Sequence, residues 1–111
     1  MAKARAMKPR QLKDTLDFYT SFGTAYVCNV RIGSYVRGGT PTIELYDAAS
    51  GEPVAVASMS VPGLGKNEVA VKNYSENEGM LKCLLIAGIV SEPHRHVQSG
   101  YVVVPVCKLL V

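Results

Sequence analysis

The chain has 111 residues, of which 48% are hydrophobic, and a formal net charge of +3 at pH 7. This length supplies one hydrophobic core but not a second, so we expect a single domain. The apolar run at 84–90 is much shorter than the roughly 18 residues of a membrane helix, and the basic start lacks the apolar centre of a secretory signal. We therefore expect a cytoplasmic protein that does not contact a membrane.

The basic residues are concentrated at the N-terminus. Residues 1–13 hold five bases and no acid, whereas the rest of the chain holds seven bases and nine acids. Such an arm can bind phosphates or an acidic partner, or it can be a solvated tail. We expect this arm and a short helix to occupy residues 1–23, and a single α+β domain to occupy residues 24–111.

The short N-terminal helix is predicted at 8–23. Pro9 suits the first helical turn, and Gly23 can end the helix. The apolar positions between them fall near one helical face: Leu12, Leu16, Phe18 and Tyr19. Because this face is small, the helix must dock on the rest of the protein.

Two alternating segments follow and predict a β-hairpin. In the segment that begins at Thr24, apolar residues occupy one face: Tyr26, Cys28, Val30 and Ile32. Residues 40–47 form the second strand of the hairpin. Gly38 and Gly39 lie between the two strands and can take the positive φ that a tight turn needs.

Two further strands are predicted in the middle of the chain. Residues 54–61 alternate, and the small side chains on one face indicate that another element packs closely there. Residues 61–67 have the composition of a loop. Residues 68–72 form a short fourth strand that leads directly into the principal helix.

The principal helix follows the fourth strand. Ser75 and Glu78 fit a capping box, and the same spacing occurs two residues earlier, so the helix begins between Asn73 and Glu78. Gly88 can end it in a left-handed conformation. Gly79 lies in the first turns, where a glycine costs about 1 kcal/mol relative to alanine, and it can permit close approach to a strand. The stripe that must cover a sheet contains Met80, Leu81, Leu84, Leu85 and Gly88.

The chain ends in a second predicted hairpin, in which residues 98–100 turn a strand at 94–97 into a long strand at 101–110. The long strand is apolar on both faces, as is typical of a strand covered on both sides. Pro105 lacks an N–H, so the strand lies at a sheet edge or is bulged at that point. Together the elements predict an α+β fold: a mostly antiparallel sheet of five or six strands, with one principal helix packed on it and a short N-terminal helix.

No catalytic, metal or cofactor site is expected. The "GLGK" stretch at 63–66 lacks the remaining glycine and the Ser or Thr of a phosphate-binding loop. His94 and His96 project to the same side of a strand but have no third metal ligand at a nearby spacing. Cys107 with His96 shows no local signature of a nucleophile and its base. The cysteines lie in apolar stretches and are expected to be reduced and buried: Cys28, Cys83 and Cys107.

Four stretches carry a resemblance to a known family. They are "TIELYD", "GEPVA", "NEVAVKNYSENEGML" and "SGYVVVPVCKL", and they lie between Arg31 and Leu109. On these stretches the chain resembles a family of small proteins of uncharacterised function that are carried by plasmids, integrative conjugative elements and phages. The family offers no catalytic motif. The resemblance implies a non-enzymatic protein of a mobile genetic element that inhibits host defence, in the manner of anti-CRISPR or anti-restriction proteins, by binding a host defence protein.

Binding of a partner protein needs aromatic and arginine anchors, which contribute a large share of binding energy. The first hairpin offers Tyr35, Arg37 and Tyr46, and the arm offers Arg5 and Arg10, which would add electrostatic steering. Nucleic-acid binding is the alternative, because tyrosines can stack on bases and the basic arm can bind phosphates. The rest of the chain is slightly acidic and has no aromatic RNA-binding motif, so protein binding is the preferred hypothesis.

Overall fold

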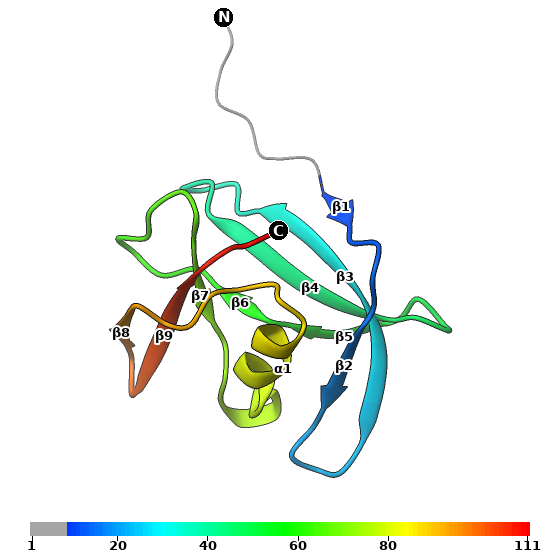
Figure 1. The fold of residues 1–111 in the computed structure, drawn as a ribbon. Coiled ribbons are helices and arrows are strands. Elements are labelled where there is room, and N and C mark those ends of the chain that lie inside the picture. The colour runs from blue at the N-terminus through cyan, green and yellow to red at the C-terminus, as the bar shows by residue number, and fades with distance from the viewer. Residues whose placement is uncertain (1–8) are drawn as a thin grey trace, which may run out of the picture.

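The structure is a computed structural model, and it describes residues 9–111. The described residues form two antiparallel β-sheets and one α-helix (Figure 1). This arrangement confirms the mostly antiparallel α+β architecture. The prediction of a single sheet of five or six strands is wrong, because the described residues contain nine strands divided between two sheets.

Sheet A contains the first five strands of the described residues. They are β1 (Arg10–Gln11), β2 (Leu16–Tyr19), β3 (Ala25–Ser34), β4 (Pro41–Asp47) and β5 (Pro53–Val56). The short strands β1 and β2 both pair with β3, while β4 and β5 follow on its other side. The predicted hairpin is confirmed as β3–β4, and Gly38 and Gly39 have φ values of 81° and 69° in its turn.

The N-terminal helix predicted at 8–23 is wrong, since the described part of this segment forms β1 and β2. Leu16 and Phe18 are each 2% exposed, whereas Tyr19 is 62% exposed, so burial follows a period of two rather than a helical period. Leu16 lies opposite Cys28 on β3. The open edge of β3 supplies hydrogen-bond partners along its length, and aromatic residues favour strands, so tertiary pairing decides the conformation.

Sheet B contains four strands, in the order β6-β7-β9-β8. They are β6 (Ser58–Met59), β7 (Glu68–Val71), β8 (Arg95–Ser99) and β9 (Val102–Lys108). The predicted short strand after the loop at 61–67 is confirmed as β7, and the C-terminal hairpin is confirmed as β8–β9.

Ala57 is the point at which the chain passes from sheet A to sheet B. The strand predicted at 54–61 is interrupted there, and its two halves lie in different sheets as β5 and β6. The Ala57 N–H donates to the Ile43 carbonyl on β4, and the Ala57 carbonyl accepts from the Lys72 N–H, each at 2.8 Å. Ala57 is fully buried, so this small residue lets the two sheets come close together.

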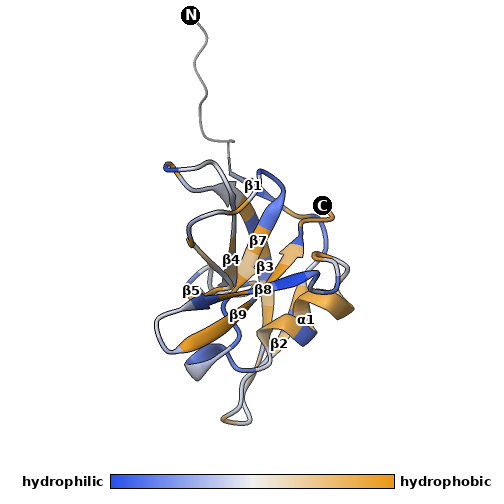
Figure 2. Ribbon diagram, turned by 90° about the vertical axis from the view of Figure 1, so that its left-hand side faces the viewer, coloured by the Kyte–Doolittle hydropathy of each residue, from blue (hydrophilic) through white to orange (hydrophobic). Residues whose placement is uncertain are grey.

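The main hydrophobic core lies between the inner face of sheet A, one face of sheet B and α1 (Met80–Ile86). Its largest fully buried apolar side chains are Phe18, Ile32, Ile43, Leu45, Met80 and Leu84. A smaller cluster covers the opposite face of sheet B and is formed by Ala70, Val104 and Val106 with Met59, Val61, Leu64, Val97 and Val102 around them. Figure 2 shows the hydrophobic residues concentrated on β9 and α1.

The strand β9 is only partly covered on both faces. Near its end, Val106 is buried in the smaller cluster and Cys107 in the main core, as predicted for a strand covered on both sides. At its start the prediction is wrong, because Val103 is 59% exposed. Pro105 lies just beyond the ladder with β7, which begins at Val106, so its missing N–H breaks no bond to that strand. Pro105 was predicted to lie either at a sheet edge or at a bulge, and it lies at a local edge.

The principal helix begins later than predicted. The 3-10 turn η1 (Ser75–Asn77) precedes α1, and no side chain caps either element in the predicted capping-box manner. Instead the N-cap is Gly79, with a φ of 94°, and the Leu81 N–H donates to Asn73 Oδ1 at 2.8 Å. A Cβ at Gly79 would lie 3.4 Å from the carbonyl oxygen of Tyr19 on β2, so this glycine permits the close approach to a strand.

The helix C-terminus and its buried face are close to the prediction. Gly88 has a φ of 72° directly after the helix, as expected for a left-handed end. Leu84 is fully buried, while Leu81 and Leu85 are only half-buried. No helix in the described part of the chain is long and apolar enough to cross a membrane.

Candidate binding face

The outer face of sheet A carries the candidate site. Alternation along β3 and β4 turns every second side chain away from the core. We use the term outer face of sheet A for these outward residues: Gln11, Val27, Asn29, Arg31, Glu44, Tyr46 and Val56. Their cross-strand pairs give the order of neighbours, with Gln11 opposite Arg31, Arg31 opposite Glu44, and Glu44 opposite Val56.

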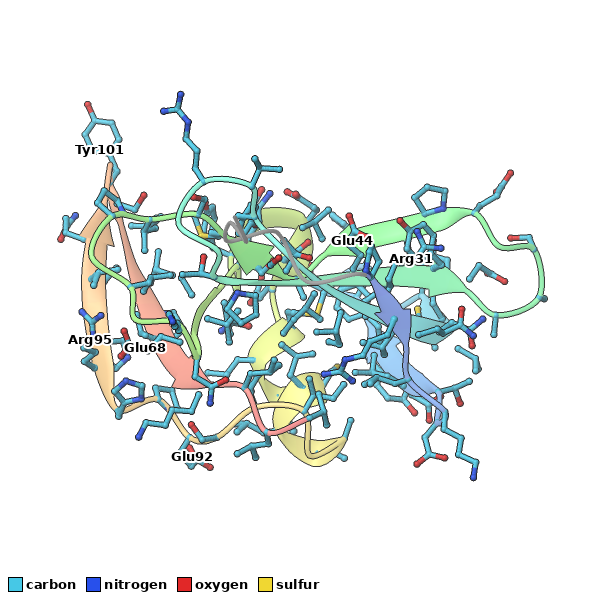
Figure 3. All side chains as sticks on the ribbon, turned by 90° about the horizontal axis from the view of Figure 1, so that it is seen from above. Arg31, Glu44, Glu68, Glu92, Arg95 and Tyr101 are labelled. Atoms are coloured by element: carbon cyan, nitrogen blue, oxygen red, sulfur yellow. The ribbon has the colours of Figure 1, made fainter. Side chains whose placement is uncertain are left out.

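Arg31 and Tyr46 form the centre of this face. The guanidinium carbon of Arg31 lies 4.4 Å from the centroid of the Tyr46 ring, a cation–π geometry. The Tyr46 hydroxyl accepts a hydrogen bond from Arg31 at 3.4 Å and donates one to Glu44 Oε1 at 3.2 Å. Figure 3 shows Arg31 and Glu44 together on this sheet, on the opposite side of the molecule from Glu68 and Arg95. The side chains of Arg31, Tyr46 and Glu44 therefore hold one another in place.

Exposed apolar residues surround the Arg31–Tyr46 pair. Val27 is 53% exposed and Val56 is 50% exposed. Beside Tyr46 a shallow hollow of about 340 Å³ opens along β4 and β5, at the bulge where the register shifts between Leu45 and Tyr46. An arginine, an aromatic ring and apolar rim residues on one face make a surface that can bury area against a partner.

The structure separates the residues that the sequence proposed as one contact surface. Tyr46 lies on the outer face of sheet A. The Tyr35 hydroxyl lies 3.2 Å from the hydroxyl of Ser58, which is buried and accepts the Ile43 N–H at 3.0 Å. Tyr35 therefore has a structural role where the chain enters sheet B. Arg37 is exposed on the β3–β4 turn, beside the loop at 60–64.

Of the two arginines proposed on the arm, the structure describes only Arg10. Arg10 is exposed on β1, opposite Ile32, at the edge of sheet A. Arg5 lies outside the described residues. Arg31 was not among the proposed anchors, although its position was readable: it alternates with the buried Val30 and Ile32 and so must point outward.

Glu68 organises a second polar cluster, at the start of β7. Its carboxylate accepts hydrogen bonds from Arg95 at 2.6 and 3.1 Å and from the Gly65 N–H at 2.8 Å, and it lies 2.5 Å from His94 Nε2. The Arg95 guanidinium, followed by the Gly65 N–H and His94, holds the pKa of Glu68 far below its usual range. Arg95 also donates to the Gly63 carbonyl, so the cluster ties the loop at 60–67 to β8. We interpret it as a structural ion pair.

We expect Glu68→Gln to lower the free energy of unfolding at pH 7. The difference from wild type should become smaller as the pH falls. Because folding lowers the pKa of Glu68 from an ordinary value of 4.5, its contribution is full above that pH and disappears as pH falls toward the folded-state pKa. Urea midpoints of wild type and variant, measured from pH 7 to about pH 3, test this. Glu92→Gln is the matched control, since Glu92 is exposed and forms no ion pair in the described residues. A loss that stays constant into acid would contradict the ion-pair role.

The cysteines have the environment of core residues. All three are free and buried, as predicted. Burial raises the pKa of Cys28 to about 11, with the Asp47 carboxylate adding to the effect, and burial also raises the pKa of Cys107 to about 11. A nucleophilic cysteine needs a lowered pKa, so these two thiols are unsuited to that role at neutral pH.

The histidines do not assemble a site with other ligands. His94 contacts Glu68, while His96 is exposed on β8 opposite Pro105. No hydrogen bond in the described residues joins His96 to the buried Cys107. Within residues 9–111 no group of three or more His, Cys, Asp or Glu side chains is arranged to hold a metal ion.

Comparisons with known proteins return no relative. No family model, no curated protein and no solved structure matches the chain. Arguments about function therefore rest on the sequence and on the geometry of the outer face of sheet A.

Proposed function

We propose that this protein is a non-enzymatic binding protein that uses the outer face of sheet A to contact a partner protein. The observation that carries the proposal is the Arg31–Tyr46 stack, fixed by Glu44 and bordered by exposed valines on a sheet face that no described element covers. Arginine and tyrosine are the residues most enriched among binding anchors. Because Tyr46, itself bonded to Glu44, holds Arg31 in place, less side-chain entropy remains to be lost on binding.

The identity of the partner is proposed from the sequence. The resemblance to proteins of mobile genetic elements makes a host defence protein the partner we propose. The protein would then act in the host cytoplasm and inhibit a CRISPR or restriction system by occupying a surface of one of its components. This mode of action requires no turnover, which agrees with the raised thiol pKa values and the structural role of the Glu68 cluster.

Charge favours a protein partner over nucleic acid. The surplus of basic residues in the chain lies in residues 1–13, whereas residues 14–111 contain seven basic and nine acidic residues and are slightly negative. On the outer face of sheet A, Arg31 lies opposite the acidic residue Glu44 across the strands. Nucleic-acid binding depends on a surplus of basic residues to neutralise phosphates, and this face has none.

The test is relief of host defence in living cells. Cells with an active CRISPR or restriction system express the protein and are infected with a targeted phage, and plaques are counted. We expect wild type to raise the plaque count, and a variant carrying Arg31→Ala with Val27→Lys to lose at least about 90% of that rise, because a central anchor is worth 2 kcal/mol or more, roughly thirtyfold in affinity.

The matched control carries Lys66→Ala with Val36→Lys. It removes one base and replaces one exposed valine by lysine, as the test variant does, at sites away from the outer face of sheet A. It should relieve defence as well as wild type does. If no defence system in a broad panel is relieved, and the purified protein binds single-stranded oligonucleotides at about 0.15 M salt, nucleic-acid binding replaces this proposal.

A further inference from the structure

A groove separates β2 from α1 and is distinct from the outer face of sheet A. Its volume is about 590 Å³, and its lining comes from the β2 segment on one side and from Gly79 and α1 on the other. Figures 1 and 2 both show β2 and α1 side by side. Cys83 lies at the groove with 7% of its surface exposed, while Ile86 on the helix wall is 77% exposed. An isoleucine this exposed beside a hollow is a surface that another apolar group can cover.

The β2 wall of the groove is a sheet edge with unused backbone groups. The Thr20 N–H donates to the Thr24 carbonyl at 2.8 Å, and the hairpin register continues from this pair through Phe18 to Leu16. Hydrogen-bonded pairs alternate along an antiparallel ladder, so Asp17 and Tyr19 direct their N–H and C=O groups away from β3.

The hydrogen bonds on the other side of β3 support the same assignment of outward backbone groups on β2. The Ala48 N–H donates to the Val27 carbonyl, so Val27 directs its backbone groups toward β4 and not toward its partner Asp17. No hydrogen bond from any other described segment reaches the outward backbone groups of Asp17 and Tyr19. This part of β2 is therefore a template for one more strand.

The groove also carries unpaired charge. Lys82 lines its helix wall and Asp17 its strand wall, and neither takes part in an ion pair within the described residues. An occupant that bears a carboxylate beside Lys82 would match this wall in charge.

We propose that the groove between β2 and α1 binds an extended, acidic and apolar segment of a partner protein, which adds to sheet A as a strand along β2. The outward N–H and C=O of Asp17 and the outward N–H of Tyr19 bond the main chain of the segment, while Gly79 packs close to the Tyr19 carbonyl. Every second side chain of the segment turns toward Cys83 and Ile86, because side chains alternate along a strand. A carboxylate at one of these same positions pairs with Lys82, which lies on the same helix wall. The groove adjoins the outer face of sheet A, since Asp17 lies opposite Val27, but it is tested by peptide binding and not by relief of defence, so it stands or fails separately from the proposed function.

A displayed library of short peptides is the probe. One library has Val, Ile or Leu at every second position, with a glutamate in place of one of them, and a second library has the same residues at helical spacing. We expect the alternating library alone to yield a peptide that binds the full chain. On binding, the amides of Asp17 and Tyr19 should gain at least about tenfold protection from hydrogen exchange, while the Phe18 amide, already directed at β3, should not change.

Substitutions separate backbone pairing from simple apolar contact. Asp17→Pro removes an outward N–H without breaking the ladder to β3, and Asp17→Asn removes the same charge but keeps the N–H. We expect Asp17→Pro to bind the selected peptide at least about tenfold more weakly than Asp17→Asn does. Ile86→Lys should weaken binding by a similar factor, whereas Val36→Lys, at a 94% exposed site on the β3–β4 turn, should not.

Three results would overturn the inference. The first is that neither library, or only the helical one, yields a binding peptide. The second is a bound peptide that leaves exchange at Asp17 and Tyr19 unchanged. The third is equal binding by Ile86→Lys and Val36→Lys, which are measured even if Asp17→Pro fails to fold.

Discussion

Replacement of Phe18 by alanine is expected to lower the free energy of unfolding by about 3–5 kcal/mol, as for other buried aromatic residues. Phe18 is 2% exposed and lies on β2 opposite Tyr26, within the main core. Removal of the ring loses its transfer free energy and leaves a cavity that sheet A cannot fully collapse. Urea unfolding followed by far-UV circular dichroism measures the change.

The neighbouring substitution Tyr19→Ala is the control, because it distinguishes a strand from a helix. Tyr19 is 62% exposed, so the expected loss is less than about 1 kcal/mol. A helix at 8–23 would place both aromatic residues near one face, and the two variants would then lose similar amounts. Equal losses would therefore contradict the assignment of β2.

The hairpins were predictable because their signals are local. In β3 the alternation of Cys28, Val30 and Ile32 specifies which face is buried, and the glycines at 38 and 39 supply the positive φ of the turn. In β8–β9 the same combination of alternation and a turn is sufficient. Each signal spans fewer than about ten residues and needs no knowledge of the rest of the fold.

The errors concern elements that distant contacts determine. Residues 16–19 are apolar enough to fit either period, and the open edge of β3 selects the strand. The division of 54–61 between two sheets depends on the hydrogen bonds of Ala57 to Ile43 and Lys72, which no local pattern contains. The helix begins later than predicted because the Asn73 side chain accepts a hydrogen bond from the Leu81 N–H, eight residues further along the chain, instead of capping its own turn.

The candidate site was predicted only in part, for the same reason. Tyr46 was identified by residue type, but its partner Arg31 is 15 residues away in sequence and meets it only through the β3–β4 register. Tyr35 has the same residue type and a structural role, because Ser58 arrives from sheet B to contact it. Residue type indicates candidate binding anchors, but the register of the sheet determines which of them lie on the same face.

Replacement of Leu84 by alanine tests the packing of α1 and is expected to cost about 2–5 kcal/mol of unfolding free energy. Leu84 is fully buried in the main core, where the helix closes the space between the two sheets. Urea unfolding at pH 7 measures the loss. Ile86→Ala is the matched control on the same helix: Ile86 is 77% exposed, so the change should stay within about 0.5 kcal/mol. Similar losses in both variants would mean that α1 does not bury the face described, and the groove between α1 and β2 would then have a different lining.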